Sequence, residues 1–384
     1  MRGKRVGVGV VLTHVGFLKE GEVVTRQIDI DTAMSPYQIL DPEGNQVGDM
    51  PDLSTEGLLS LYRYMQLGRA FSNKIIALQR QGRATTFGSL AGQEATAVGL
   101  AAPMQAQDWL TTSHREIASL MVRGFPLATL IYAFRGFTPA NYPRETHCLP
   151  FQIVIGTQML HAVGLAMAAK ISGDPVVAVG VCGDGATSEG DFNEALNFAG
   201  VFQAPVVLVV QNNGWAISVP RHKQSAAPTL AARGIGFGLP SYLVDGNDVL
   251  AVYDVMQQAI ARARSGQGPT LVETLTYRIG AHTTADDPTR YRNPDEVEAW
   301  RAKDPITRFQ RFLMKRDLLS EEQERQLIAA IEEEINDAVR EAEAMPAMAP
   351  DSFFDYATAT LSPRQQAQRA DLLRYVDSKQ HGKG

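Results

Sequence analysis

The sequence is poor in cysteine, in net charge and in long apolar runs, and each shortage excludes a class of protein. Cys148 and Cys182 are the only cysteines among 384 residues, which excludes a disulfide framework and predicts a reducing, cytoplasmic setting. The formal net charge of −6 argues against a surface that binds nucleic acid. No apolar run reaches the roughly 20 residues of a membrane-spanning helix. We therefore expect neither a nucleic acid nor a membrane as a partner.

The chain changes in character along its length. Basic residues precede a short apolar run at the N-terminus (MRGKRVGVGVVLTHVGF), but no cleavage site of small residues follows, so we expect an irregular tail rather than a signal peptide. Turn-forming residues then continue to about residue 53 without a dense core pattern. The predicted organisation is an N-terminal arm over residues 1–53, an α/β domain over 54–313, and a C-terminal helical region and tail over 314–384.

The best-defined stretch is residues 176–218, which read VVAVGVCGDGATSEGDFNEALNFAGVFQAPVVLVVQNNGWAIS. Two apolar runs rich in valine flank a helical segment, a pattern typical of a βαβ unit. The first run ends in Gly183-Asp184-Gly185 and the second in Asn212-Asn213-Gly214. Ligands of open parallel sheets bind beyond the carboxyl ends of the strands, so both polar clusters are expected at one edge of the sheet.

The residue types in these clusters predict a phosphate site that contains a metal ion. Gly183 and Gly185 allow a tight turn and close approach of a phosphate, and the helix that begins near residues 188–191 offers its N-terminal amides to an anion. Asp184 would repel a bare phosphate, and a divalent cation resolves that conflict. Mg²⁺ prefers an octahedron of oxygens, which the side chains of Asp184 and Asn213, the Trp215 carbonyl, two diphosphate oxygens and a water would supply.

Gly-Asp-Gly, then residues 186–211, then Asn-Asn resembles the diphosphate-binding motif of thiamine diphosphate enzymes. The surrounding GDGATSEGDFNEALNFA and NNGWAIS resemble one branch, the alpha subunit of the decarboxylating dehydrogenase component of 2-oxo acid dehydrogenase complexes. This resemblance extends from about residue 58 to about residue 313. It implies a doubly wound, mostly parallel α/β sheet with helices on both faces, and it implies thiamine diphosphate and Mg²⁺ as cofactors.

The resemblance also assigns roles to residues outside the central stretch. It implies that His114 and Arg115 contact the diphosphate, and that His282 lies beside the thiazolium and supports acyl transfer. A histidine just past a strand end is in any case a good proton-transfer group. The residues assigned to the cofactor are His114, Arg115, Ile153, Ile155, Gly183, Asp184, Gly185, Ala186, Asn213, Trp215 and His282. Thr157 and Gln158 partly match a monovalent-cation motif of branched-chain relatives.

Three departures from the family pattern keep a second class of function open. His114 stands where the family has a tyrosine, Gln211 stands where branched-chain relatives have an arginine, and residues 134–151 form a shorter, proline-rich loop. Losing one charged hydrogen bond costs about 1.5–3 kcal/mol, or roughly tenfold to a hundredfold in affinity. The alternative is therefore a partner subunit that binds the cofactor but is catalytically impaired. A dinucleotide-binding oxidoreductase is disfavoured because the first turn is not G-x-G-x-x-G.

The reaction and partners follow from the resemblance. The family decarboxylates a 2-oxo acid and transfers the acyl group to a lipoyl-lysine, and AARGIGFGLPSYLVDGNDVLAVY and TYRIGAHTTADDPTRYR are more similar to branched-chain than to pyruvate subunits. A pyruvate or acetoin dehydrogenase alpha subunit remains the alternative within this class. No second βαβ unit supplies the glutamate that activates the cofactor. We therefore expect a beta subunit, an assembly of two alpha and two beta chains, and a lipoyl-bearing acyltransferase core.

Overall fold

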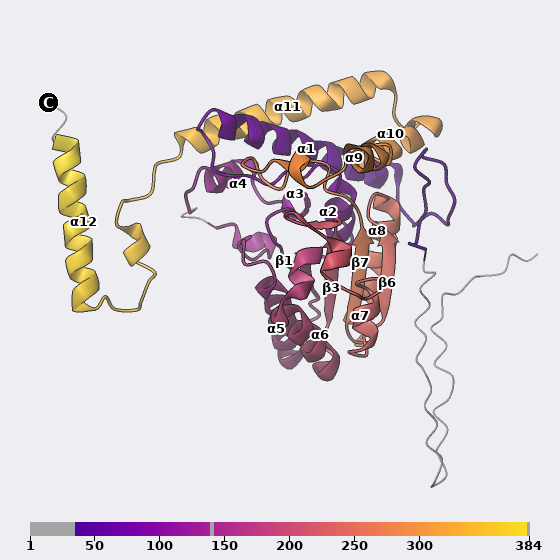
Figure 1. The fold of residues 1–384 in the computed structure, drawn as a ribbon, viewed down its shortest axis with the longest axis horizontal. Coiled ribbons are helices and arrows are strands. Elements are labelled where there is room, and N and C mark those ends of the chain that lie inside the picture. The colour runs from indigo at the N-terminus through magenta and orange to yellow at the C-terminus, as the bar shows by residue number, and fades with distance from the viewer. Residues whose placement is uncertain (1–34, 139–141, 382–384) are drawn as a thin grey trace, which may run out of the picture. The chain divides into compact units, whose positions relative to one another are not determined.

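A five-stranded, wholly parallel sheet lies at the centre of the computed structural model, which describes residues 35–138 and 142–381. The strand order is β1-β2-β3-β7-β6 (Figure 1). Its strands are β1 (Trp109–Thr111), β2 (Ala178–Gly183), β3 (Val206–Asn212), β6 (Ser241–Asp245) and β7 (Thr270–Leu275), and a separate antiparallel ribbon joins β4 (Trp215–Ala216) to β5 (Val219–Pro220). The predicted irregular tail before residue 35 lies outside the described residues.

Helices cover both faces of the sheet because successive strand residues point to opposite sides. Val179 and Val181 of β2 enter a core shared with α2 (Glu94–Ala101) and α8 (Val249–Arg264). Ala178 and Cys182 enter a second core with α5 (Thr157–Ser172) and α6 (Gly190–Phe202). Both faces are buried, which explains the nearly continuous apolar strands. The predicted α/β class with helices on both faces is confirmed.

Several of the remaining helices contribute buried residues to the first core. The remaining helices are α1 (Thr55–Arg80), α3 (Ile117–Val122), α4 (Leu127–Phe134), α7 (Ala232–Ile235), α9 (Pro294–Arg301), α10 (Pro305–Lys315), α11 (Glu321–Ala344) and α12 (Pro363–His381). Ser54 caps α1 by accepting the Gly57 amide at 3.2 Å, and Ser320 with Gln323 forms a reciprocal capping box on α11. Within the described ranges, no helix is both long and apolar enough to cross a membrane.

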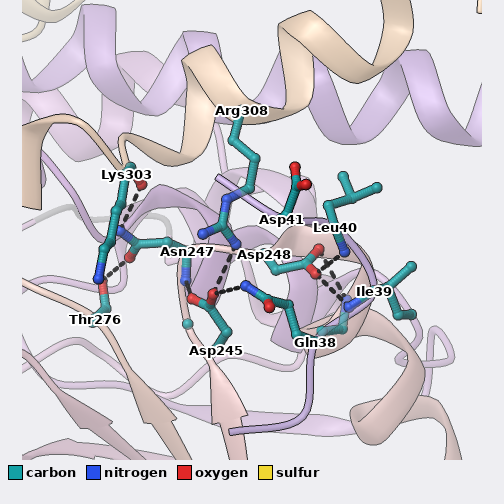
Figure 2. A network of polar contacts seen from close by, with 12 residues as sticks. Gln38, Ile39, Leu40, Asp41, Asp245, Asn247, Asp248, Thr276, Lys303 and Arg308 are labelled. Atoms are coloured by element: carbon teal, nitrogen blue, oxygen red, sulfur yellow. Dashed lines mark hydrogen bonds and ion pairs between the residues drawn. The ribbon is translucent and has the colours of Figure 1, made fainter. Parts of the chain in front are cut away.

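The described part of the predicted arm, residues 35–53, packs on the edge strand β6. Tyr37 forms a parallel bridge with Val244, and Ile39 and Leu40 are fully buried. The Asp248 carboxylate accepts the amides of Ile39 and Leu40 at 2.7 and 2.6 Å, as Figure 2 shows. This segment therefore contributes to the core of the domain.

Helices α10 and α11 also share the first core. The boundary expected after residue 313 falls inside α10, and Ile331 and Ile335 of α11 are buried with residues of α1 and α4. Beyond α11 the chain forms a helix, α12, that the proline- and alanine-rich composition did not predict. Arg369 of α12 pairs with Asp351 at 2.8 Å.

Candidate functional site

A cavity of about 230 Å³ lies at the carboxyl ends of β2 and β3. All but one of the predicted cofactor-binding residues line it, although they come from five separate parts of the sequence. The predicted residues in the lining are His114, Arg115, Ile155, Gly183, Asp184, Gly185, Ala186, Asn213, Trp215 and His282. The exception is Ile153, whose side chain is outside the lining and 72% exposed.

The turn after β2 is a 3₁₀ helix over Asp184–Ser188. Within this turn, Thr187 Oγ1 donates to the Asp184 carbonyl at 2.8 Å. This turn lines the cavity where the first turn of α6 was expected. A Cβ on Gly185 would lie 2.7 Å from the Ala216 Cβ. Glycine is therefore required for the β4–β5 ribbon to approach the turn.

Asp184 is a buried carboxylate without a cationic partner. It is 2% exposed, it receives a hydrogen bond from Gln224 Nε2 at 3.1 Å, and it forms no ion pair within the described residues. Burial raises its pKa. An unpaired carboxylate in such a place is costly unless a cation neutralises it.

The oxygens around Asp184 suit a hard divalent cation. Asn213 and Trp215 line the same cavity, and the Trp215 amide donates to Asn213 Oδ1 at 3.2 Å. The described ranges contain no cluster of three or more His, Cys, Asp or Glu that could hold a metal. One carboxylate with neutral oxygens leaves coordination positions for phosphate oxygens, which is the usual arrangement for Mg²⁺. The residues present therefore fit the predicted metal.

Two buried guanidiniums lie at the site: Arg115 lines the cavity, and Arg278, which is outside the lining, contacts Nδ1 of the lining residue His282. They are 5% and 0% exposed, and neither has a carboxylate partner in the described part of the chain. Arg115 donates to the Ser89 carbonyl at 2.8 Å, and Arg278 donates to the Ile217 carbonyl at 2.7 Å. Burial, with the nearby Arg278 charge, lowers the pKa of Arg115 to about 9. Two desolvated cations with no counter-ion form an anion site.

Arg278 was not predicted from the sequence. It lies just beyond the end of β7, after Thr276 and Tyr277, and so belongs to the same sheet edge as the two polar clusters. A basic residue at that position was the signal that could have identified it.

His282 lies between the two arginines. Its Nδ1 accepts from Arg115 Nη2 at 3.0 Å and from Arg278 Nη1 at 3.1 Å, so its proton is on Nε2. Burial and the two guanidinium charges lower its pKa to about 4. The Asp286 carboxylate accepts the His282 backbone amide at 2.8 Å and so stabilises the loop that contains both residues. The imidazole is therefore neutral at neutral pH and can donate from Nε2.

His114 is a second neutral imidazole in the same lining. Its ring centroid lies 6.2 Å from that of His282. Burial, followed by the charge of Arg115, lowers the pKa of His114 to about 3. At neutral pH it can therefore contribute one hydrogen bond to an anion but no positive charge.

Two isoleucines in the lining have left-handed backbones, Ile155 with φ of 63° and Ile217 with φ of 54°. A β-branched residue is rare at positive φ, and the cost is of the order of 1–3 kcal/mol. Gln158 Nε2 donates to the Ile155 carbonyl at 2.8 Å and helps to hold this conformation. Such strain is typical of ligand sites. Ile217 had no recognisable signal in the sequence, because backbone conformation at an exposed isoleucine leaves no compositional mark.

Thr157 and Gln158, which partly match the monovalent-cation motif, and His147 of the 134–151 loop are absent from the cavity lining. His147 packs on Trp109 with ring centroids 5.1 Å apart, and its Nδ1 lies 2.8 Å from the Ala106 carbonyl, away from the cavity lining. Thr157 Oγ1 donates to Asp191 at 2.7 Å. Gln158 Nε2 is bonded to the Ile155 carbonyl, whereas the buried Gln158 Oε1 has no hydrogen-bond partner within the described residues. The described part of the 134–151 loop adds no residue to the lining.

The chain is an α/β protein with a cavity at the carboxyl edge of a parallel sheet, lined by a buried carboxylate and a buried guanidinium, Asp184 and Arg115. The family model of the dehydrogenase E1 component matches residues 62–351. The chain therefore belongs to the dehydrogenase E1 component family, and the resemblance identified from the sequence is confirmed.

Three relatives match over most of their length. The chain is 45% identical over 346 residues to the 3-methyl-2-oxobutanoate dehydrogenase subunit alpha of Mycobacterium tuberculosis, covering 88% of this chain and 94% of that protein. It is 39% identical over 355 residues to the pyruvate dehydrogenase E1 component subunit alpha of Staphylococcus aureus, covering 91% and 96%. The pyruvate dehydrogenase E1 component subunit alpha of Acholeplasma laidlawii is 42% identical over 330 residues, covering 85% and 96%.

Proposed function

We propose that this chain is the alpha subunit of a branched-chain 2-oxo acid dehydrogenase that uses thiamine diphosphate and Mg²⁺. The reaction is oxidative decarboxylation of a 2-oxo acid with transfer of the acyl group to a lipoyl-lysine. One observation carries the proposal: the cavity is lined by an unpaired buried carboxylate, Asp184, and an unpaired buried guanidinium, Arg115, and His282 Nδ1 joins Arg115 to a second such guanidinium, Arg278. A diphosphate bound with a divalent cation neutralises both kinds of charge at once.

The chain's own residues have distinct tasks in this site. Arg115 and Arg278 bind the diphosphate, while Asp184, Asn213 and the Trp215 carbonyl hold the cation. The cofactor, when bound, supplies the electron sink for decarboxylation. His282 is neutral, is held at Nδ1 by two arginines, and presents the proton on Nε2 to the substrate side of the site.

Exposed apolar side chains support a partner subunit. Ile171 on α5 and Phe198, Val201 and Phe202 on α6 are 84%, 42%, 69% and 47% exposed, on the two helices that cover one face of the sheet. Exposed apolar patches of this kind mark interaction surfaces. We propose that a beta subunit completes the active site in an assembly of two alpha and two beta chains. A lipoyl-bearing acyltransferase core is the proposed acceptor.

The proposed substrate is a branched-chain acid such as 3-methyl-2-oxobutanoate, the substrate named for the relative at 45% identity. Pyruvate is the second candidate, since relatives named for it are 39–42% identical over similar lengths. The cytoplasmic setting expected from the cysteine content stays a prediction.

An assay that follows reduction of an artificial electron acceptor separates these candidates. The chain, co-purified with its beta subunit, is supplied with thiamine diphosphate, Mg²⁺ and an artificial electron acceptor, and is offered 3-methyl-2-oxobutanoate, pyruvate and acetoin in turn. We expect the highest kcat/KM with the branched-chain acid. A higher kcat/KM with pyruvate or acetoin would transfer the assignment to that substrate. Cofactor binding without turnover of any of the three would favour the catalytically impaired subunit.

A further inference from the structure

We infer that Gln93 is a positioning residue that fixes the side-chain amide of Asn213 with its oxygen toward the cavity. This inference rests on the proposed function, because it concerns the oxygen that Asn213 offers to the cation. Gln93 does not line the cavity. It lies behind Asn213 and is 1% exposed.

The observation is a continuous line of buried hydrogen bonds between side chains. Gln211 Nε2 donates to Glu116 Oε1 at 3.1 Å and to Gln93 Oε1 at 3.1 Å. Asn213 Nδ2 donates to the same Gln93 oxygen at 3.0 Å. All four side chains belong to residues that are at most 5% exposed, so water does not compete for these bonds.

The direction of each amide follows from its neighbour. A backbone N–H only donates, so the Trp215 amide requires the Asn213 oxygen, Oδ1, to face it. The Asn213 NH₂ group therefore faces Gln93, which presents its own oxygen to that group and to the Gln211 NH₂ group. Glu116 Oε2 accepts the Ser113 amide at 2.9 Å. Within the described residues, Gln93 Nε2 and Gln211 Oε1 have no hydrogen-bond partner.

The backbone holds Gln93 in place independently of these side chains. Gly92 has φ of +96°, and a Cβ there would lie 2.3 Å from the Tyr277 carbonyl, so only glycine permits this approach. Thr276 Oγ1 donates to the Gly92 carbonyl at 2.6 Å. The Gln93 amide donates to the Leu90 carbonyl at 3.0 Å. Gln93 is thus anchored to the segment that follows β7 and can orient Asn213 before any ligand binds.

Without the Gln93 oxygen, the orientation of the Asn213 amide depends on the Trp215 amide alone, at 3.2 Å from Oδ1. A turned amide would present a donor to the cation, which repels it. Residues that orient metal ligands in this way typically contribute 10–100-fold to metal affinity. We therefore expect Gln93→Leu to weaken Mg²⁺ binding by about 10–100-fold.

The test is a calorimetric titration of Mg²⁺ at fixed thiamine diphosphate into the co-purified assembly. Gln93→Leu should weaken binding as stated, and adding Asn213→Asp should restore most of the affinity, because a carboxylate has two equivalent oxygens and needs no orientation. A role of Gln93 in packing alone would not be rescued by that second change. Gln257→Ala, on the exposed face of α8, is the matched glutamine control and should bind as the wild type does.

Thermal melting without ligand shows whether each variant folds. If Gln93→Leu does not fold, Gln93→Asn, which is shorter by one methylene and cannot span the same contacts, provides the same comparison. Unchanged Mg²⁺ affinity in the folded Gln93 variant, or a loss that Asn213→Asp does not recover, overturns the inference alone. Absence of Mg²⁺-dependent binding in the wild type overturns the proposed function as well.

Discussion

Two buried polar clusters lie at the carboxyl edge of the same sheet, and they differ in how their charges are satisfied. In the first, the edge cluster of Asp245, Asp248 and Arg308, Arg308 Nη1 pairs with Asp245 at 2.8 Å (Figure 2). Asp248 accepts four backbone amides, two from residues 39–40 and two from the first turn of α8. In the cavity, by contrast, Asp184 has no cation and Arg115 and Arg278 have no carboxylate among the described residues.

The difference separates a structural cluster from a binding site. Both clusters are desolvated, and burial raises the pKa of Asp248 to about 6 as it raises that of Asp184. Only the edge cluster compensates its charges within the chain. The cavity leaves its charges uncompensated, a cost that a folded protein bears where a ligand supplies the partner. The following predictions test that contrast.

The largest expected effect is that of Asp184→Ala, which removes the only carboxylate among the predicted cation ligands. Mg²⁺-dependent binding of thiamine diphosphate should fall below detection, measured by calorimetry on the co-purified assembly. Asp174→Ala, an exposed aspartate in the turn after α5, is the matched control. Unchanged binding in Asp184→Ala would contradict the assignment of Asp184 as a ligand of the cation.

Arg308→Met should lower the unfolding free energy without changing the affinity for thiamine diphosphate. Removing one partner of a buried ion pair leaves Asp245 uncompensated and costs about 3 kcal/mol of unfolding free energy. Denaturant unfolding measures this loss. Affinity for thiamine diphosphate in the folded variant should equal that of the wild type, and a large drop in affinity would show that the edge cluster also serves the ligand.

Arg115→Met should show the opposite pattern. Loss of one charged hydrogen bond to the diphosphate weakens binding by roughly tenfold to a hundredfold. The unfolding free energy should fall by less than in Arg308→Met, because no ion pair is broken. If the two arginine variants lose equal stability, the distinction between paired and unpaired clusters does not hold.

The smallest expected effect concerns pH. The folded-state pKa values of His114 and His282, about 3 and about 4, lie below the usual value of 6.5. Between pH 6.5 and about 4 the unfolded chain binds more protons than the folded one, so stability is lost as the pH falls through this window. His114→Gln should make unfolding free energy depend less steeply on pH there. Equal slopes for variant and wild type would contradict the burial of this imidazole.

Much of this organisation could be predicted from the sequence, because local patterns carry it. Valine-rich runs ending in Gly-Asp-Gly and Asn-Asn-Gly predicted β2, β3 and the cavity edge. The helix expected to begin near residues 188–191 is α6, which begins at Gly190. The family resemblance added His114 and His282, which no local pattern would have joined to the central stretch.

The rest depends on contacts between distant segments. Arg278 and Gln93 owe their roles to the packing of the loop before α2 against the end of β7, which no sequence period encodes. Ile39 and Leu40 looked like part of a surface arm because the surrounding residues form turns, yet the Asp248 carboxylate draws their amides into the core. Ile153 and Ile155 are both isoleucines, so their sequence does not distinguish them. Ile155 has a left-handed backbone and lines the cavity, whereas Ile153 is exposed.

The most direct test of the central claim is a titration of thiamine diphosphate into the co-purified alpha and beta subunits, with and without Mg²⁺. The account predicts saturable binding of one cofactor per alpha chain that requires Mg²⁺, because the unpaired Asp184 otherwise repels the diphosphate. Binding of equal strength without the cation, or no binding under either condition, would contradict the assignment of these unpaired charges to the cofactor.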